Sequence, residues 1–375
     1  MARVVAGMSG GVDSSVAAAL LARQGHEVIG VSLQLHDLSQ AGRAARCCSP
    51  EDFLDARRVC SQLGIPYYVV DREELFGWRV LDHFAGEYRA GRTPNPCVRC
   101  NADVKFEELG ALARSLGAGA VATGHYARLT GRPGQPGRAL LRASDREKDQ
   151  SYFLFDLTDE QRALALFPLG GMSKAEVRRE AVSLGLATAC KPESQDICFL
   201  EGTDYRGFLR ARQEESGEPP EAPGEMVDTT GRVLGRHGGV SGFTVGQRRG
   251  LGVSSARRLY VVQVDAASRR VVLAEEDALL CGALELTGIR LASPPPGPGP
   301  FPATVKVRHR HHGTPARVTC LPDGGGLVEL LEPVRGVSPG QAAVFYDQDL
   351  VIGGGWIAAA RPAGSVPAAA AAALP

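Results

Sequence analysis

Lysine is scarce in this chain, and several other features are missing altogether. Of the 42 basic residues only five are lysines, namely Lys105, Lys148, Lys174, Lys191 and Lys306. Acidic residues also number 42, so the formal net charge is zero and no overall positive field points to a nucleic acid. Any RNA-binding surface must therefore be a local patch. The chain has no apolar run of membrane length and no signal-like start, so we expect a cytoplasmic protein with no membrane partner.

A disulfide framework is also not indicated. The chain has nine cysteines, an odd number spread over 375 residues, which favours reactive or metal-binding thiols instead. Cys60, Cys190, Cys281 and Cys320 are expected to be core residues. The pair Cys47–Cys48 lies in an Arg-rich loop and has no assignment.

The clearest motif lies close to the N-terminus. A predicted strand over residues 3–6 and a predicted helix over residues 14–24 flank a glycine-rich turn, in which Val12-Asp13 stands where a Walker motif would have its lysine. Glycines allow close approach of a ligand, and the helix start attracts an anion. A cradle without that lysine suits a pyrophosphate that leaves with Mg²⁺, although an ordinary strand–helix turn is the alternative. The pattern resembles the PP-loop of ATP pyrophosphatases, whose phosphate-binding residues would be Gly7, Met8, Ser9, Gly10, Gly11, Val12, Asp13 and Ser14.

Residues 1 to about 125 alternate between strand and helix patterns. Further strands are predicted over residues 26–35, 65–70 and 120–123, and helices over residues 51–63, 75–90 and 106–116. The helix predicted over residues 75–90 carries an apolar stripe that is expected to be core, formed by Phe76, Val80, Phe84 and Tyr88. This alternation predicts an α/β fold with a doubly wound parallel sheet, in which residues 7–15, Leu33 and residues 124–125 follow strand ends and can line one pocket.

The character of the chain changes further on. Residues 131–137 form a Gly/Pro loop, residues 173–184 a helix with a capping box, and residues 190–200 a loop that leads into a short strand. We expect domain boundaries that give a catalytic domain over 1–204, a small β-rich domain over 205–275 and a C-terminal β-barrel over 276–360. The Ala/Pro-rich tail over 361–375 is expected to be disordered.

Three cysteines are candidates for chemistry. Cys97 and Cys100 form a Cys-x-x-Cys between prolines and an asparagine, and Cys198 follows an acidic, polar run. Cys97 and Cys100 could form half a zinc site, all three cysteines could hold an iron–sulfur cluster, or Cys100 and Cys198 could carry and release sulfur by thiol exchange. The alternative is that they are buried small hydrophobic residues without a chemical role. An adenylating cradle combined with mobile sulfur defines a reaction class: ATP turns a carbonyl oxygen into a leaving group, and sulfur replaces it.

Longer stretches of sequence make a family resemblance specific. The chain resembles the bacterial tRNA-specific 2-thiouridylases, which thiolate the wobble uridine of certain tRNAs. The motifs that carry the resemblance span almost the whole chain and cover residues 7–14, 91–101, 122–127, 148–154, 193–199, 243–252 and 338–346.

The resemblance implies a role for each candidate residue. Cys198 would carry a persulfide taken from a desulfurase-derived donor, and Cys100 would close a disulfide with it or release sulfide. Leu33 and Gly124 would border ATP, which would enter with Mg²⁺, and an iron–sulfur cluster at Cys97, Cys100 and Cys198 stays an open alternative. The residues implied to meet the anticodon stem-loop of the tRNA are Asn95, Pro96, Cys97, His125, Lys148, Asp149, Gln150, Arg308, His309 and Gln341. A monomer is expected.

The distribution of basic residues agrees with the tRNA-binding role that the resemblance implies. The densest basic cluster of the chain falls in the predicted barrel, although a solvated strand face is an equal reading. The chain also departs from the family: Cys97 stands where some relatives have Asp, and His309 where Tyr is common. Two other classes stay open, a PP-loop ligase acting on a small molecule and a non-enzymatic RNA module that binds sulfur or metal.

Overall fold

A computed structural model describes residues 1–36, 49–193, 197–200 and 204–363. The chain divides into two compact units, each assembled from separate segments. The first unit comprises Met1–Leu81, Pro96–Asp204 and Asp349–Val351, and the second comprises Asp82–Asn95, Tyr205–Gln348 and Ile352–Pro375.

A five-stranded parallel sheet organises the first unit, which confirms the predicted α/β class. Its strand order is β3-β2-β1-β4-β7, so the chain moves outwards from β1 through β2 to β3 and then crosses back to β4. This crossing makes the carboxyl ends of β1 and β4 the switch point where ligands bind in such sheets. The strands are β1 (Arg3–Gly7), β2 (Glu27–Gln34), β3 (Tyr67–Asp71), β4 (Ala120–Ala122) and β7 (Ala165–Leu166).

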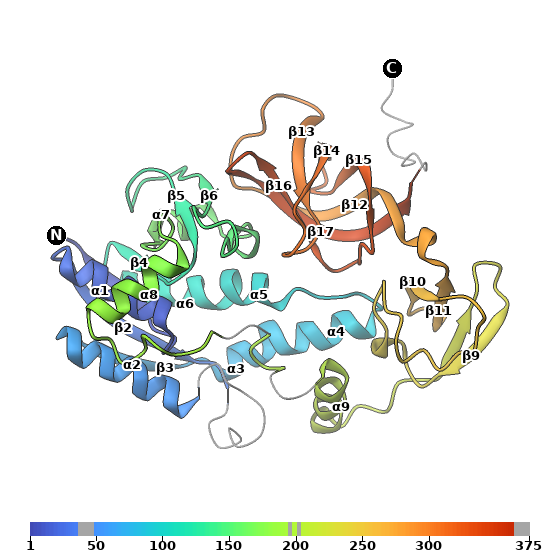
Figure 1. Ribbon diagram of the computed structural model, residues 1–375, viewed down its shortest axis with the longest axis horizontal. Helices are drawn as coiled ribbons and strands as arrows, with labels where there is room; N and C mark the ends of the chain where they lie inside the picture. Colours follow the sequence, from blue (N-terminus) through green and yellow to red (C-terminus); the bar gives the residue numbers. More distant parts are fainter. Residues whose placement is uncertain (37–48, 194–196, 201–203, 364–375) are drawn as a thin grey trace. The chain divides into compact units, whose positions relative to one another are not determined.

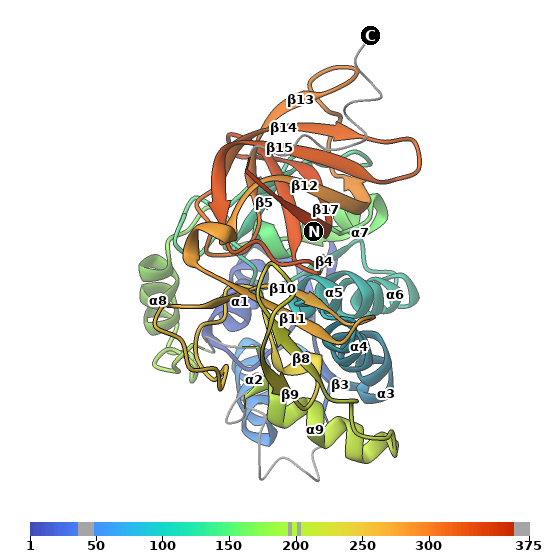
Figure 2. The ribbon, with the colours of Figure 1, turned by 90° about the vertical axis from the view of Figure 1, so that its right-hand side faces the viewer.

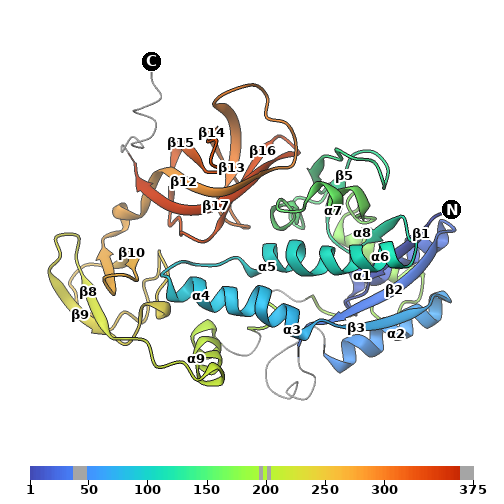
Figure 3. The same cartoon turned by 180° about the vertical axis from the view of Figure 1, so that it is seen from behind.

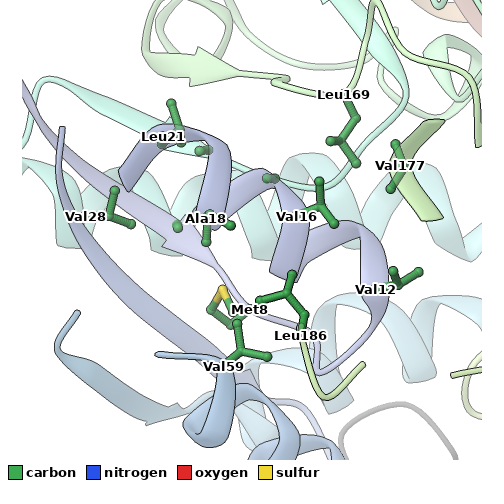
Figure 4. Packing of buried hydrophobic residues seen from close by; sticks show 14 of the residues in the cluster. Met8, Val12, Val16, Ala18, Leu21, Val28, Val59, Leu169, Val177 and Leu186 are labelled. Atoms are coloured by element: carbon green, nitrogen blue, oxygen red, sulfur yellow. The ribbon is translucent and has the colours of Figure 1, made fainter. Parts of the chain in front are cut away.

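Helices cover both faces of this sheet. Helices α1 (Val12–Arg23), α2 (Pro50–Leu63) and α8 (Lys174–Ser183) lie on the face seen in Figure 1, and α6 (Glu107–Ser115) lies on the face seen from behind in Figure 3. Figure 4 shows the core between α1 and its neighbours, where Val16, Ala18 and Leu21 of α1 meet side chains from β2, α2 and α8. The other elements of this unit are α3 (Glu73–Phe76), π-helix η2 (Gly77–Asp82, whose last residue belongs to the second unit), α5 (Pro96–Arg99), π-helix η3 (Cys100–Phe106), β5 (Ala127–Leu129), β6 (Leu140–Arg142), 3₁₀-helix η4 (Ser151–Phe153) and α7 (Asp159–Leu164).

Local sequence signals account for several of these boundaries. Ser49 caps α2 in a capping box with Asp52, and Gly64 ends the helix at φ 68°. Ser173 and Glu176 form the predicted capping box of α8. The predicted helices over residues 51–63, 106–116 and 173–184 are therefore confirmed within one or two residues.

The second unit contains a small mixed sheet and a barrel. The sheet has the order β10-β11-β8-β9, and six antiparallel strands in the order β12-β15-β14-β13-β16-β17 close through pairing of β12 with β17 (Figure 2). The apolar core inside this barrel includes Leu284, Val318 and Phe345. The elements are α4 (His83–Arg89), α9 (Tyr205–Ser216), β8 (Gly224–Val227), β9 (Val233–His237), η5 (Val240–Gly242), β10 (Tyr260–Asp265), β11 (Arg270–Ala274), η6 (Glu276–Leu279), β12 (Leu280–Leu291), β13 (Phe301–Lys306), β14 (Thr314–Cys320), β15 (Gly326–Arg335), β16 (Ala342–Asp347) and β17 (Leu350–Pro362).

Some sequence expectations were wrong. Residues 205–216 form helix α9 although β structure was expected, because a polar sequence with an internal glycine hides a helix that buries mainly Leu209. Residues 199–200 lie in a turn and not in a strand. Cys190 and Cys320 are exposed, whereas Cys60 and Cys281 are buried as predicted. Cys47 and Cys48 lie outside the described residues.

The predicted start of the tail at residue 361 was also wrong. Arg361 and Pro362 complete β17, and Arg361 forms an ion pair with Glu285 of β12. Residues 364–375 lie outside the described residues.

The aromatic stripe of residues 76–88 is core, as its spacing predicts. Phe84 is 1% exposed and its ring contacts Tyr88 and, at 5.7 Å, Phe208 of α9. We expect Phe84→Ala to lower the free energy of unfolding by about 3–5 kcal/mol, because it leaves a cavity under α9. Urea unfolding measures the change, and Trp78→Ala, at a 61% exposed position, is the control with an expected change below about 1 kcal/mol.

Candidate active site

A cavity opens at the switch point of the parallel sheet. It encloses about 240 Å³, close to the lower end of the volumes of small-molecule pockets. Segments that follow β1, β2 and β4 meet there, as expected from the strand ends. The sequence-predicted residues among its lining are Gly7, Met8, Ser9, Asp13, Ser14, Leu33, Gly124, His125 and Gln150, and Asp52, Phe53 and Lys105 also contribute.

Ser14 holds the glycine-rich turn at the start of α1. The hydroxyl of Ser14 donates to the carbonyl of Gly11 (3.1 Å) and accepts from the N–H of Ser9 (3.2 Å), which folds the loop back over the start of α1. The N-cap of α1 is Gly11, a residue without side-chain oxygen, so the first-turn N–H groups can bind an anion. Gly10 has φ +72°, and a Cβ there would lie 2.3 Å from the carbonyl oxygen of Asp52.

The cation absent from the motif is supplied from elsewhere in the chain. Lys174, at the start of α8, places its Nζ 2.7 Å from Oδ1 and 2.8 Å from Oδ2 of Asp13. The hydroxyl of Tyr126 donates to the same carboxylate at 2.8 Å, and burial together with the charge of Asp13 raises the pKa of Tyr126. The turn itself has no lysine, and Lys174, which pairs with Asp13, lies 161 residues away in the sequence.

A second lysine holds the turn from the other side. The Nζ of Lys191 donates to the carbonyl of Gly10 (3.0 Å) and pairs with Asp52 and Asp55, both at 2.7 Å. Burial alone would lower the pKa of Lys191, but the two carboxylates outweigh it and raise the pKa. Neither lysine was singled out from the sequence, because each acts across more than 130 residues.

The segment 148–150, predicted to meet RNA, is braced within the protein. Lys148 pairs with Glu193 at 2.7 Å, and Gln150 accepts the backbone N–H of Tyr126 at 2.9 Å. The buried carboxylate of Asp149 accepts from the hydroxyl of Ser151 and from the N–H of Ala143. Only Gln150 of the three lines the cavity among the described residues.

Glu193 is the most highly connected carboxylate of this region. Burial raises its pKa, but hydrogen bonds from Lys148 and Lys174 outweigh burial and lower the pKa to about 2. Arg178 approaches its carboxylate at 3.4 Å.

This lowered pKa predicts an acid-dependent stability. Because the ionised form of Glu193 is favoured by folding, its contribution is complete above its unfolded pKa near 4.5 and is lost as the pH falls towards 2. We expect Glu193→Gln to lower the free energy of unfolding by about 1–2 kcal/mol at pH 7, discounted for partial exposure, and by much less at pH 3. Urea unfolding of both proteins at the two pH values measures this, and an equal difference at both would contradict it.

His125 lines the cavity and is half-buried. Burial, with a contribution from the charge of Lys105, lowers the pKa of His125 to about 3, so the ring is neutral at physiological pH. Its Nδ1 lies 2.8 Å from the hydroxyl of Thr123, and Phe106 and Phe167 flank the ring. A neutral imidazole fixed in this way can exchange hydrogen bonds with a base but offers no positive charge to a phosphate.

The candidate thiols belong to the first unit. Cys100 is buried at the start of η3, whereas Cys97 in α5 and Cys198 are half-buried. Phe199, next to Cys198, packs edge-on against Phe76 of α3 at 6.2 Å, and α3 contacts η3. The elements that carry Cys100 and Cys198 are therefore linked through α3. No group of three or more His, Cys, Asp or Glu side chains is placed to hold a metal ion within the described part of the chain, which includes all three cysteines.

The remaining predicted residues lie in the second unit, apart from Pro96. Gln341 donates through Nε2 to the carbonyls of Thr93 (3.0 Å) and Pro94 (2.9 Å), and so braces the loop that leads to Asn95, which is 8% exposed. Arg308 and His309 follow β13, where the guanidinium of Arg308 donates to the carbonyl of Arg335. Within the same basic cluster, burial and the charge of Arg308 lower the pKa of His311 to about 4.

Comparison with known proteins identifies the class of protein that this fold and site define. Three family models match consecutive parts of the chain: a tRNA methyl transferase HUP domain over residues 2–202, a tRNA methyl transferase PRC-barrel domain over residues 216–275, and an aminomethyltransferase beta-barrel domain over residues 283–357. The chain thus belongs to a class of tRNA-modifying proteins in which a PP-loop α/β domain is followed by two β domains.

Curated relatives specify the family. The tRNA-specific 2-thiouridylase MnmA of Geobacter metallireducens is 51% identical over 371 residues, covering 96% of this chain and 98% of that protein. The protein of the same name from Geotalea uraniireducens is 50% identical over 360 residues, covering 95% and 94%. The chain therefore belongs to the tRNA-specific 2-thiouridylase (MnmA) family, and the resemblance stated from the sequence motifs is confirmed. A solved 4-thiouridine synthetase–RNA complex with bound ATP gives a TM-score of only 0.34 at 15% identity, over 57% of this chain and 50% of that one.

Among the described residues, no helix has both the length and the apolar character needed to span a bilayer.

Proposed function

We propose that this protein catalyses the ATP-dependent 2-thiolation of the wobble uridine of tRNA. The observation that carries the proposal is the cavity at the switch point, where the glycine-rich turn, Gly124 and His125 meet in a chain that belongs to the thiouridylase family. The phosphates of ATP would lie over the turn and the first-turn amides of α1, and the adenosine would extend towards Leu33.

The proposed chemistry begins with adenylation. The oxygen on C2 of the uracil attacks the α-phosphate of ATP, and pyrophosphate leaves. The outer sulfur of a Cys198 persulfide then attacks C2, and AMP leaves with the former carbonyl oxygen. Finally the Cys100 thiolate attacks the Sγ of Cys198, which frees 2-thiouridine and leaves a Cys100–Cys198 disulfide for an external thiol to reduce.

The first unit supplies groups suited to these steps. The amides of the turn would stabilise the charge on the departing pyrophosphate, and Lys105 lines the same cavity. The neutral ring of His125 would hydrogen-bond the target base. Acid–base chemistry by a carboxylate is not available at position 97, where the side chain is the thiol of Cys97.

The donor groups of the first unit limit which metal ions can take part in the reaction. Mg²⁺ would arrive with ATP and be held mainly by its phosphates, because the carboxylate of Asp13 already accepts from Lys174 and Tyr126. The described residues form no three-ligand group at Cys97, Cys100 and Cys198, so no step is assigned to an iron–sulfur cluster. Anaerobic purification followed by iron and sulfide analysis tests that alternative directly.

The second unit is proposed to hold the tRNA. Its basic cluster, with Arg308 and His309, would contact the RNA backbone, and the persulfide donor would be a second protein partner. The monomeric state stays a prediction, which sedimentation velocity tests.

A direct assay tests the function as a whole. The purified protein is given ATP, Mg²⁺, an unmodified tRNA transcript and a persulfide source, and 2-thiouridine is measured by nucleoside mass spectrometry alongside pyrophosphate release. We expect both products and a requirement for tRNA. A small-molecule ligase would release pyrophosphate without tRNA, and a non-enzymatic RNA module would release none.

A further inference from the structure

One ion-pair network joins the phosphate-binding turn to the chain segment that leads to Cys198. Its centre is the Nζ of Lys174, which lies 2.7 Å from Asp13 and 3.0 Å from Glu193. Asp13 belongs to the turn, whereas Glu193 precedes Cys198 by five residues. A single ammonium group therefore connects the nucleotide site with the segment that carries the proposed sulfur carrier.

The three charged groups at the centre of this network are largely withdrawn from water. The side chain of Lys174 is 11% exposed, and those of Asp13 and Glu193 are 30% and 24% exposed. Charges withdrawn from water in this way need their partners, because an uncompensated buried charge is strongly destabilising. A change in the position or charge of Asp13 must consequently change the ion pair between Lys174 and Glu193.

A second bridge joins the same two segments. Lys191 donates to the carbonyl of Gly10 in the turn and also pairs with Asp52. Lys191 and Glu193 flank Pro192, so the stretch that leads to Cys198 is fastened to the turn at two points only two residues apart. Among the described residues, the cavity lining contains none of Lys174, Lys191 and Glu193.

We propose that Lys174 and Glu193 are positioning residues that make the placement of Cys198 depend on the state of the phosphate-binding turn. Triphosphate bound over the turn brings negative charge close to Asp13 and so redistributes Lys174 between Asp13 and Glu193. Nucleotide binding thereby changes the ion pairs of Glu193, five residues before Cys198, and through them the placement of Cys198. This inference rests on the proposed role of Cys198 as sulfur carrier.

The decisive variant is Glu193→Gln, which keeps the shape of the side chain and removes its charge. In one reaction mixture, pyrophosphate and 2-thiouridine are both quantified. We expect pyrophosphate release to stay within about threefold of wild type while 2-thiouridine falls at least about tenfold, so that adenylation runs without productive sulfur transfer. Glu193→Asp, which retains the charge, should restore part of the yield.

A matched control distinguishes this from a general loss of stability. Glu180, on the same helix as Lys174, pairs with Arg23, whose side chain is 59% exposed. Glu180→Gln should leave the ratio of the two products unchanged. Equal losses of both products in Glu193→Gln would make it a structural residue and overturn the proposal.

A second measurement tests the coupling without turnover. Alkylation of Cys198 by iodoacetamide is followed by mass spectrometry, with and without an ATP analogue whose α,β-bridging oxygen is replaced by methylene. The exposed Cys320 is the internal reference. We expect the analogue to change the rate at Cys198 by at least about threefold in the wild type and not in Glu193→Gln. An unchanged rate in the wild type would contradict the coupling, whereas full thiolation by Cys198→Ser would contradict the sulfur-carrier role instead.

Discussion

Replacement of Cys198 by serine is expected to lower 2-thiouridine formation by at least about 1000-fold while tRNA-dependent pyrophosphate release continues. A serine hydroxyl cannot accept sulfane sulfur as a persulfide, so the sulfur carrier is lost, whereas the nucleotide cavity is lined by other segments of the chain. The measurement is nucleoside mass spectrometry of the tRNA, with pyrophosphate assayed in the same mixture.

The matched control is Cys190→Ser. Cys190 lies eight residues before Cys198 and is exposed, so its replacement tests whether any thiol in this region matters. We expect wild-type yields from it. If Cys198→Ser kept more than about a tenth of the wild-type yield, sulfur would reach the base by another route.

Cys100→Ser separates the two roles that the sequence left open for this residue. If Cys100 acts after transfer, its loss leaves the tRNA bound to Cys198 through a C2–S–S bond, and a protein–RNA adduct that dithiothreitol cleaves should accumulate. If Cys100 instead releases sulfide beforehand, the variant forms neither adduct nor product. Denaturing gel electrophoresis with and without reductant distinguishes these outcomes.

The sequence was sufficient wherever short-range signals decide the structure. The glycine-rich turn, the capping box of Ser173 and Glu176 and the apolar stripe at residues 76, 80, 84 and 88 act within a few residues, and the structure places them as expected. The alternation of strands and helices also predicted the parallel sheet and four of its five strands, whereas the two-residue strand β7 was not predicted.

Features that depend on distant partners were not visible in the sequence. Lys174 and Lys191 look like ordinary solvated cations in their own segments, yet they hold the phosphate-binding turn from positions 161 and 181 residues away from it. Helix α9 was missed because it buries mainly Leu209 and packs Phe208 against Phe84, contacts that leave no strong apolar pattern in a polar sequence. The same limit applies to Gln341, whose amide braces the chain at Thr93.

Gly124→Ala is expected to abolish pyrophosphate release, with a loss of at least about 100-fold. A Cβ at this position would lie 2.6 Å from the backbone nitrogen of Ser14 and 2.7 Å from the carbonyl carbon of Asp13, and these atoms belong to the first turn of α1. Because both are backbone atoms, no side-chain rotation relieves the clash, and the amides that would bind phosphate must move.

Gly119→Ala is the matched control. Gly119 lies just before β4 and Gly124 shortly after it, and a Cβ at Gly119 would meet no described atom within 4 Å. The control variant should release pyrophosphate at the wild-type rate. Calorimetric titration with the methylene analogue of ATP then locates the defect: we expect Gly124→Ala to bind it at least about tenfold more weakly, with circular dichroism unchanged. Wild-type affinity in this variant would mean that the close approach of residues 124 and 14 serves the packing of the sheet and not the nucleotide, and the phosphate site would have to lie elsewhere on the turn.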